Sequence, residues 1–225
     1  MTRVRVLSYN ILLGGQRGEP MFDVVREAAP DLLVVNECPR GLLSWRRRCA
    51  SLADRWSLRW VTGGRPAGSN MLLVSDRVAV MAAGSQLLPH PLFQWRRGIV
   101  WAQLSIGGQP VGVVGSHLSL RRQDRVREAE HLVAAASRLS GTVLVAGDFN
   151  ERPTGPVWQR LHREGFADHG SRSWLTFPSD DPVKRIDAVL VRGPARVVSH
   201  GDPGLPTDML AAASDHRPVL AELEL

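Results

Sequence analysis

The residues best suited to chemistry lie in one short stretch, where an apolar run ends in Gly-Asp-Phe-Asn at positions 147–150. Val143 to Ala146 predicts a short strand buried on both faces, and Gly147 lets the backbone turn after it. In an extended chain, residues i and i+2 point the same way, so Asp148 and Asn150 are predicted to face one point. A carboxylate that orients or deprotonates water, beside an amide that donates to an oxygen gaining charge, suits reaction at a phosphate. An Asx turn after a core strand is the structural alternative.

Other polar side chains also follow predicted strands. Asn10 follows a strand at 3–9, Glu37 follows one at 32–35, and His117 follows one at 111–114. Burying a carboxylate such as Glu37 costs free energy unless a cation meets it, and a divalent metal is one such cation. Taken alone, Glu37 also fits a residue that emerges into solvent, and His117 fits a structural histidine.

The polar residues at predicted strand ends form one chemically coherent set. The set is Asn10, Glu37, His117, Asp148, Asn150, Asp187, Asp215 and His216. Carboxylates with a neutral amide suit a hard cation such as Mg²⁺, and two histidines with an available aspartate form a general acid–base set. The set therefore predicts metal-assisted phosphoryl chemistry. A zinc hydrolase, a Walker-type NTPase, a dinucleotide-binding protein and a serine hydrolase are not predicted, since their motifs are absent from the sequence.

The elements that must position these residues form a strand-rich α/β pattern. Further strands are predicted at 56–61, 71–75, 78–82, 99–106, 184–191, 196–200 and 219–225, and helices at 21–29, 41–54, 121–139 and 153–164. Gly201 to Met209 is predicted to be a Pro/Gly-rich loop. Many strands with few helices, and no linker or repeat, predict a single domain over 1–225 with a large layered sheet core.

The amino-acid composition indicates the class of ligand and the cellular location. The net charge is +6 with a pI of about 10.7, which suits a polyanionic or phosphorylated ligand, although arginines that only solvate the surface fit equally. No apolar run approaches the ~20 residues of a membrane span, and the chain starts in a strand pattern without a signal-peptide core. We therefore expect a cytoplasmic protein without a membrane segment. Cys38 and Cys49 do not make a plausible zinc site, and a disulfide between them is left open.

Several motifs occur in an order that is shared with a known family. They are Leu7-Ser8-Tyr9-Asn10-Ile11, Gly147-Asp148-Phe149-Asn150, Thr176-Phe177-Pro178, Arg185-Ile186-Asp187 and Ser214-Asp215-His216. On these motifs the sequence resembles the endonuclease/exonuclease/phosphatase superfamily, the DNase I-like metal-dependent phosphoesterases, over nearly its whole length. The resemblance implies an α/β (α+β) four-layer sandwich, in which two mainly antiparallel β-sheets pack face to face with helices outside. It also implies a phosphoesterase site at one end of the sandwich.

The resemblance further implies which residues hold the metal and activate water. Glu37 matches the principal Mg²⁺ ligand, with Mn²⁺ as a substitute, and Asn10 lies beside it. Asp215 matches a second or water-mediated ligand. Asp148 matches the residue that orients or deprotonates the attacking water, and Asn150 matches the one that holds a phosphate oxygen.

The remaining roles concern the phosphate and the leaving group. His216 matches a histidine that contacts the phosphate and is oriented by Asp187, a pair also given the base role. His117 matches the histidine that donates to the phosphate or protonates the leaving group. Asn70 and Arg97 match positions that line the phosphate site.

Two departures from the family pattern refine the expected function. Leu12 stands where abasic-site endonucleases have an acid, and His117 stands where they have a tyrosine, so the match is nearer to DNase I, sphingomyelinase, deadenylase and inositol phosphatase. We expect a monomeric Mg²⁺-dependent phosphodiesterase, with nucleic acid as one potential substrate. The alternative is a phosphomonoesterase acting on a small metabolite, inositol phosphate or nucleotide, and a non-enzymatic binding module is least favoured.

Specificity is expected in three loops, at 63–68, 89–97 and 201–213. Trp95, beside Arg96 and Arg97, has the chemistry to stack a base or sugar near a phosphate. Packing in the core or a loop is the favoured interpretation for Trp95, as for most of the seven tryptophans.

Overall fold

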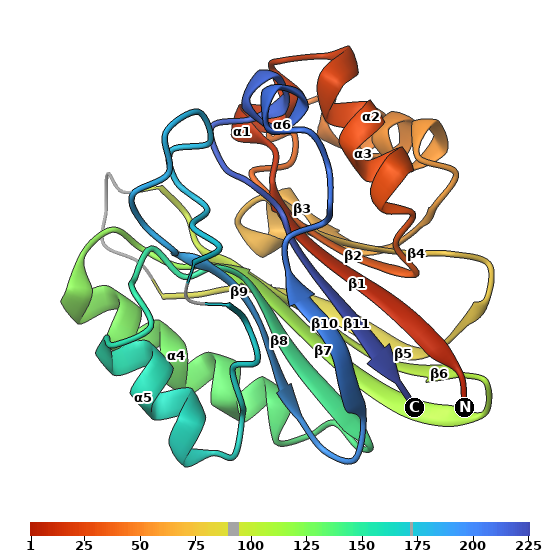
Figure 1. Cartoon of the computed structure of the whole chain (residues 1–225), viewed down its shortest axis with the longest axis vertical. Coiled ribbons are helices and arrows are strands. Elements are labelled where there is room, and N and C mark those ends of the chain that lie inside the picture. The colour runs from red at the N-terminus through yellow and green to blue at the C-terminus, as the bar shows by residue number, and fades with distance from the viewer. Residues whose placement is uncertain (90–94, 172) are drawn as a thin grey trace.

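Two β-sheets packed face to face form the centre of the molecule, with helices on both outer faces (Figure 1). The computed structural model describes residues 1–89, 95–171 and 173–225. The first sheet has the strand order β10-β11-β1-β2-β4-β3, and the second has the order β5-β6-β7-β8-β9. This is the layered arrangement expected from the family resemblance.

The strands have the following bounds. In the first sheet they are β1 Arg3–Asn10, β2 Leu32–Asn36, β3 Arg59–Gly64, β4 Asn70–Val74, β10 Arg196–Gly201 and β11 Val219–Glu224. In the second sheet they are β5 Val78–Leu87, β6 Gly98–Ile106, β7 Gln109–His117, β8 Thr142–Asp148 and β9 Asp187–Arg192. Neighbouring strands are antiparallel except β1 with β2 and β7 with β8, so the prediction of mainly antiparallel sheets is confirmed.

The helices divide between the two outer faces. They are α1 Leu12–Gly15, α2 Glu19–Ala28, α3 Trp45–Arg55, the 3₁₀ turn η1 Arg65–Ala67, α4 Arg122–Ala136, α5 Pro156–Arg163 and α6 Thr207–Ala213. Helices α2, α3 and α6 cover the first sheet, and α4 and α5 cover the second (Figure 1).

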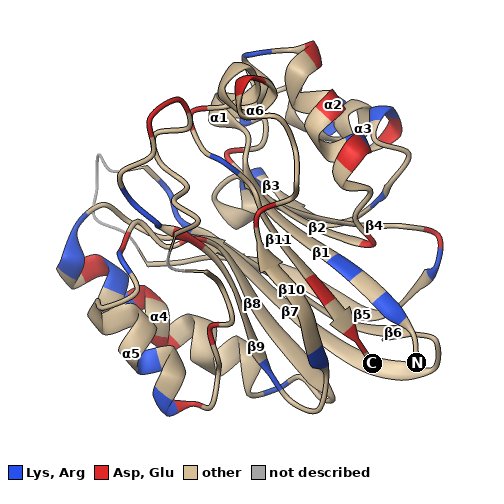
Figure 2. Ribbon diagram, viewed as in Figure 1, with Lys and Arg blue, Asp and Glu red and all other residues tan. Residues whose placement is uncertain are grey.

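Three hydrophobic clusters hold these four layers together. One lies between the sheets, and includes Val34 of β2 and Leu144 of β8. The second joins the first sheet to α2, α3 and α6, and the third joins the second sheet to α4 and α5 around Trp158. Charged residues gather on the helices, the loops and the far ends of the strands (Figure 2). Burial of apolar surface on both faces of each sheet is therefore the main term that stabilises the sandwich.

The prediction of a loop over Gly201 to Met209 is wrong in its last residues, because α6 begins at Thr207. Pro206 precedes the helix, Asp208 lies in its first turn, and Leu210 and Ala213 are buried against the α2 side of the molecule. Proline is compatible with a helix start, and an acidic first turn favours one. The Pro and Gly content of the segment therefore concealed a short amphipathic helix.

The remaining differences from prediction are shifted or altered bounds and two short helical turns. Strand β5 runs to Leu87 and β7 runs to His117, both beyond their predicted ends, and β3 and β9 begin later than predicted. Helices α4 and α5 are shorter than predicted at both ends, α3 begins later and α2 begins earlier. The turn η1 lies in the predicted loop at 63–68, and α1 was not predicted. Cys38 and Cys49 are buried free thiols. No helix among the described residues is long and apolar enough to cross a membrane.

Candidate active site at the ends of the central strands

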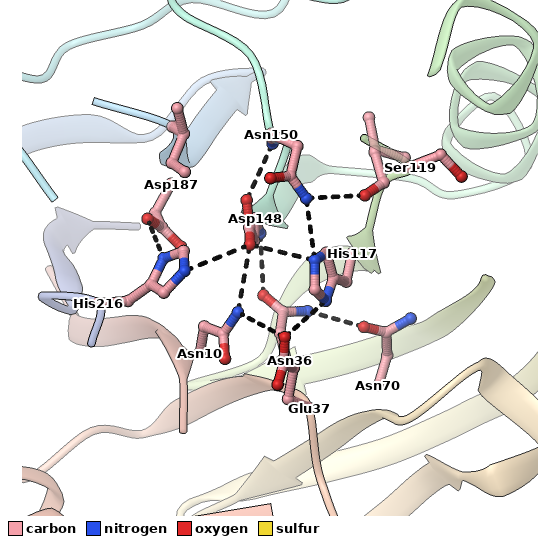
Figure 3. A network of polar contacts seen from close by, with 12 residues as sticks. Asn10, Asn36, Glu37, Asn70, His117, Ser119, Asp148, Asn150, Asp187 and His216 are labelled. Carbon is pink, nitrogen blue, oxygen red and sulfur yellow. Dashed lines mark hydrogen bonds and ion pairs between the residues drawn. The ribbon is translucent and has the colours of Figure 1, made fainter. Parts of the chain in front are cut away.

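The register of the two parallel strand pairs gathers polar residues at one end of the sandwich. Asn10 ends β1 directly beside Asn36 at the end of β2, and His117 ends β7 directly beside Asp148 at the end of β8. Asp187 begins β9 opposite Asp148. Because parallel strands end at the same edge of a sheet, their last residues lie side by side, and the facing sheets bring the two groups together (Figure 3).

Asp148 lies at the centre of this network and is buried. Its Oδ2 accepts a hydrogen bond from Asn10 Nδ2 (3.2 Å) and lies 3.2 Å from His117 Nε2 and 3.8 Å from His216 Nε2. Burial, together with the nearby charge of Asp187, raises the pKa of Asp148 to about 7. A carboxyl group with a pKa near neutrality is suited to accept and release a proton at physiological pH.

Asn150 reaches the network by a different backbone path from the one predicted. The strand ends at Asp148, and Asn150 has a positive φ of 49°. Its backbone N–H donates to Asp148 Oδ1 (2.9 Å), which is the Asx turn weighed as the structural alternative. Its side-chain Nδ2 donates to Leu118 O and contacts His117 Nε2, both at 2.9 Å. The turn and the convergence of Asp148 and Asn150 are therefore features of one arrangement.

His216 and Asp187 form a buried pair. His216 Nδ1 lies 2.9 Å from Asp187 Oδ2, and the ring packs against Phe177 with ring centroids 4.8 Å apart. Burial lowers the pKa of His216, but the carboxylate of Asp187 outweighs burial and Asp148 adds to its effect, so the pKa rises to about 10. The imidazole is therefore cationic at neutral pH, with Nδ1–H directed to Asp187 and Nε2–H directed toward Asp148.

Thr176 fixes the position of Asp187. Its Oγ1 accepts hydrogen bonds from the backbone N–H groups of Ile186 (3.1 Å) and Asp187 (3.3 Å). Thr176 and Phe177 belong to one of the motifs on which the family resemblance is based. Their contacts explain that motif, because one residue anchors the aspartate and the next packs on the histidine.

His117 differs from His216 in its charge at neutral pH. Burial lowers its pKa well below the ordinary value, and the positive charges of Arg97, His216 and Arg40 lower it further. The ring is therefore neutral at neutral pH. An amide nitrogen can only donate, so we assign His117 Nε2 as the acceptor of the 2.9 Å contact from Asn150 Nδ2, with the ring proton on Nδ1. The 3.2 Å contact between Nε2 and Asp148 Oδ2 then requires a proton on Asp148.

Glu37 borders the network on the side away from His216. Its backbone has a positive φ of 59°, which turns the chain at the end of β2. Oε2 accepts a hydrogen bond from Leu13 N (2.9 Å), while Oε1 has only long contacts, 3.4 Å to Asn10 Nδ2 and 3.8 Å to His117 Nδ1. Within the described residues, one carboxylate oxygen of Glu37 thus faces the network without a close donor.

The donor set fits a hard divalent cation. Glu37 Oε1 and Asp148 Oδ2 both lie near Asn10 Nδ2, and such carboxylate oxygens are the ligands that Mg²⁺ and Mn²⁺ prefer. Asp148, Asp187 and His216 also have one potential ligand atom each within 4.8 Å of one another. Because His216 carries a proton there and is bonded to Asp187, the space between Glu37 and Asp148 suits a cation better.

Two asparagines join the sheets beneath the site, and the sequence indicated only one of them. Asn36 is fully buried; its Oδ1 accepts a hydrogen bond from Asp148 N (2.9 Å), and its Nδ2 donates to Asn70 Oδ1 (2.7 Å). Asn70 Nδ2 donates to Ala67 O (2.7 Å) and Gly98 O (2.8 Å). Since both amide hydrogens of Asn70 are donated to the backbone, these contacts do not agree with its expected role as a phosphate ligand. The position of Asn36 at a strand end, next to Glu37, was the signal that could have indicated it.

Asp215 and Arg97 lie at the edge of the network. The side chain of Asp215 is half-buried and accepts a hydrogen bond from Ser214 Oγ of its own turn (3.4 Å), and its charge helps to raise the pKa of His216. Arg97 is buried, which lowers its pKa, while the nearby Asp148, Glu128 and Glu37 oppose that effect. The structure thus places a buried cation, Arg97, near the central acidic groups, and places Asp215 near His216.

A second buried cluster supports the loop that follows β7. Glu128 of α4 accepts hydrogen bonds from Ser119 N (2.8 Å) and Ser119 Oγ (2.5 Å), and Arg125 Nη1 donates to Ser119 O (3.1 Å) and Leu120 O (2.6 Å). This loop contains Leu118, whose carbonyl holds the Asn150 amide. Helix α4 therefore positions Asn150 indirectly.

Comparisons with known proteins agree with this arrangement. Residues 7–216 match the sequence profile of the Endonuclease/Exonuclease/phosphatase family. A search of curated proteins found no match. Among solved structures, an endonuclease/exonuclease/phosphatase from Bacteroides vulgatus is 18% identical, with a TM-score of 0.79 and 100% of each chain covered.

Two further structures have the same fold. The mannosyl-6-phosphatase of Bacteroides thetaiotaomicron is 16% identical, with a TM-score of 0.78 and coverage of 99% of this chain and 100% of that chain. The D. rerio TDP2, solved in complex with a single-strand DNA product, is 16% identical, with a TM-score of 0.71 and 100% of each chain covered. At such identities the likeness concerns the fold alone.

Proposed function

The chain belongs to the endonuclease/exonuclease/phosphatase family of metal-dependent phosphoesterases, and we propose that it hydrolyses a phosphodiester by attack of a water molecule positioned at Asp148. The observation that carries the proposal is the environment of Asp148. It is a buried carboxylate whose Oδ2 accepts a hydrogen bond from Asn10 Nδ2 and lies where His117 Nε2 and His216 Nε2 converge. A catalytically silent binding module, the least favoured expectation, does not agree with membership of an enzyme family.

Asp148 and His216 divide the chemistry between them. Asp148 accepts the proton of the attacking water, and its two oxygens are held in place by Asn10 Nδ2 and Asn150 N. His216, kept cationic by Asp187, offers Nε2–H to an oxygen that gains negative charge in the transition state. The neutral His117 orients the Asn150 amide through Nε2 and directs its Nδ1–H toward Glu37.

Glu37 and Asp148, with Asn10 beside them, are the residues proposed to hold Mg²⁺, with Mn²⁺ as a substitute. Bound there, such an ion would polarise a phosphoryl oxygen and lower the pKa of a water molecule. Asp215, whose charge acts on His216, remains a candidate for a second or water-mediated ligand.

The basic character of the chain favours a diester that belongs to a polyanionic strand. The chain carries a net charge of +6, and an excess of basic residues attracts polyanions.

A phosphomonoesterase remains the second candidate, and one observation favours it. The mannosyl-6-phosphatase of B. thetaiotaomicron matches this chain over the full length of both, so the fold without large insertions is compatible with that activity. The TDP2 structure contains single-strand DNA, so the same fold also accommodates a nucleic acid.

Hydrolysis of a matched substrate pair tests the proposal. Bis(p-nitrophenyl) phosphate and p-nitrophenyl phosphate would be assayed with Mg²⁺ or Mn²⁺, followed by single-stranded DNA, plasmid DNA and RNA. We expect higher kcat/KM for the diester, and loss of that activity in Asp148→Asn but not in Asp76→Asn, a control at an exposed position outside the site. Activity on monoesters alone would select the second candidate, and equal activity of Asp148→Asn and the wild type would overturn the site assignment.

A further inference from the structure

A basic hollow lies beside the Glu37 turn, between the segment that follows β3 and the segment that precedes β6. One part has a volume of about 220 Å³ and is lined by Arg40, Arg65, Gly68, Ser69, Trp95 and Arg96. A neighbouring part of about 400 Å³ shares Arg65 and Arg96 and adds Trp45, Arg46, Pro66 and Leu87. We refer to both parts together as the arginine pocket.

Glycine makes the close backbone approach that shapes this pocket. Gly68 has a φ of 61°, and a Cβ at that position would lie 2.5 Å from the carbonyl carbon of Arg97 and 2.6 Å from Gly98 N. A side chain at position 68 would therefore push the 65–68 turn away from the chain that carries Arg96. The close approach at Gly68 therefore fixes the backbone on this side of the pocket.

The charge of the pocket is of one sign. Among the described residues that line it, four are arginines and none is acidic. Within the described part of the chain, Arg46, Arg65 and Arg96 have no carboxylate within 4.0 Å, and Arg40 only reaches Glu37 at that distance. Like charges gathered in a hollow repel one another, so an anion that enters it is favoured, and a guanidinium group binds phosphate oxygens in pairs.

Trp95 gives the pocket an aromatic wall. The side chain is 68% exposed, which differs from the packing role predicted for it, and the guanidinium of Arg40 lies 4.5 Å from its ring centroid. The exposed indole can stack on a sugar or a base, and the arginines beside it can bind a phosphate. Together they suit a ligand in which a phosphate is joined to a sugar or base.

The pocket is connected directly to the candidate metal ligand. Arg40 Nη2 lies 4.0 Å from Glu37 Oε2, and Cys38 N donates to Ser69 O (2.9 Å), which ties the Glu37 turn to the pocket wall. A substrate whose reacting phosphate lies near Glu37 and Asp148 can therefore extend a neighbouring group into the pocket.

We propose that the arginine pocket binds a second phosphate group of the substrate, joined through a sugar or nucleoside to the phosphate that is hydrolysed. The inference rests on the proposed function for the position of the reacting phosphate. Such a second phosphate is present in a nucleic-acid strand and in a small bisphosphorylated metabolite, and the pocket chemistry is the same for both.

Kinetics on paired substrates test this subsite. Thymidylyl-thymidine and its 5′-phosphorylated form differ by one phosphate, as do glycerophosphoinositol and glycerophosphoinositol 4-phosphate, and each of the four contains a phosphodiester. The variants are Arg65→Gln and Arg96→Gln, with Arg163→Gln on the exposed end of α5 as the matched control. Arg40 is left unchanged because it lies close to Glu37.

We expect each variant to raise KM about tenfold for the substrates with a second phosphate, with kcat unchanged and less than about a twofold change for thymidylyl-thymidine. A rise in KM confined to the nucleotide pair would identify a strand as the source of the second phosphate, and a rise confined to the glycerophosphoinositol pair would identify a small metabolite. Equal KM changes within each pair, or none, would overturn the proposal.

A binding measurement in EDTA separates this inference from the proposed function. Titration of octathymidylate and of inorganic pyrophosphate into the metal-free protein would be followed by tryptophan fluorescence at several salt concentrations. We expect weaker binding of at least one probe in Arg65→Gln and Arg96→Gln, and for the oligonucleotide a salt dependence reduced by about one phosphate contact.

If the wild type hydrolyses thymidylyl-thymidine while the variants bind both probes as the wild type does, only the pocket is overturned. If the wild type hydrolyses no ester yet the variants bind more weakly, only the proposed function is overturned.

Discussion

Asn36 Oδ1 accepts a hydrogen bond from the backbone N–H of Asp148 at 2.9 Å, and this bond joins the two sheets directly beneath the candidate catalytic carboxylate. Asn36 belongs to β2 of the first sheet and Asp148 to β8 of the second. The same amide donates to Asn70 Oδ1, and Asn70 in turn donates to Gly98 O of β6. Two buried asparagines thus set the spacing of the sheets at the site, where apolar packing alone would not fix it to hydrogen-bond accuracy.

Replacement of Asn36 by leucine tests this relationship. The substitution preserves approximate size but leaves Asp148 N–H and Asn70 Oδ1 buried without their partner. Unsatisfied buried groups cost about 1–3 kcal/mol each, so we expect the free energy of unfolding to fall by about 2–4 kcal/mol. Urea unfolding followed by circular dichroism measures it. Gln109→Leu, at an exposed position, is the control, and a loss no larger than the control's would contradict the role of Asn36.

Asn36 also shows how far sequence reasoning reached. Its position after an apolar run was visible, as for Asn10, Glu37, His117 and Asp148, because buried strands that end in polar residues are readable from pattern alone. Its partner Asn70 is on another strand, and only the strand order places the two together. Pairing between distant strands is set by tertiary packing, which carries no local signature.

Backbone conformation was the second feature that could not be predicted from the sequence. The two-residue spacing of Asp148 and Asn150 was read as extended chain, but Asn150 adopts a left-handed conformation. Asparagine tolerates this conformation better than most residues, so the sequence permitted either reading. The α6 helix was missed for a related reason, since the proline that precedes it is compatible with both a loop and a helix start.

Asp148→Asn is expected to stabilise the fold while it removes activity. In the folded protein, burial raises the pKa of Asp148 to about 7, above the value of about 3.9 in an unfolded chain. A raised pKa favours the folded state fully below pH 3.9, and that contribution is lost as the pH rises through 7. At pH 8 the ionised carboxylate therefore opposes folding, and a neutral amide does not.

We expect the free energy of unfolding of Asp148→Asn in EDTA to exceed that of the wild type by about 1–3 kcal/mol at pH 8 and to approach it at pH 5. We expect kcat to fall by about 10³-fold or more with the metal present. Denaturant titrations at the two pH values, beside single-substrate kinetics, measure both effects. A variant less stable than the wild type at pH 8 would show that the ionised carboxylate of Asp148 does not destabilise the folded protein.

Asp187→Asn should release the proton of His216. The folded pKa of His216 is about 10, compared with about 6.5 in an unfolded chain, so its stabilising charge is fully present below pH 6.5 and is lost as the pH rises through 10. Without Asp187, burial dominates, and we expect the pKa to fall to about 7 or lower. NMR titration of the His216 ring in EDTA measures it, and kcat/KM should fall by about 10²-fold or more. An unchanged pKa of His216 in Asp187→Asn would show that Asp187 does not keep His216 protonated.

Glu37→Gln should weaken metal binding before it affects the chemical step. The oxygen that faces the network loses its charge, while the contact with Leu13 N can persist. We expect the Mg²⁺ concentration for half-maximal activity to rise at least about tenfold, with a smaller change in kcat at saturating metal. Calorimetric titration of Mn²⁺ without substrate gives an independent value. Glu19→Gln, at an exposed ion pair with Arg55, is the control, and an unchanged metal titration would remove Glu37 from the ligand set.

His117→Ala distinguishes a leaving-group acid from a positioning residue. The sequence allowed the acid, but burial and Arg97 hold the pKa of His117 well below its ordinary value, and a neutral ring whose Nε2 accepts from Asn150 is a poor proton donor. A leaving-group acid matters most when the leaving group is poor, whereas loss of positioning affects all substrates alike. We therefore expect kcat/KM to fall by a similar factor, about 10²-fold, for bis(p-nitrophenyl) phosphate and for an unactivated alkyl phosphodiester. A loss confined to the alkyl diester would instead assign the leaving-group proton to His117 and require that its Nδ1–H turn from Glu37 toward the substrate during the reaction.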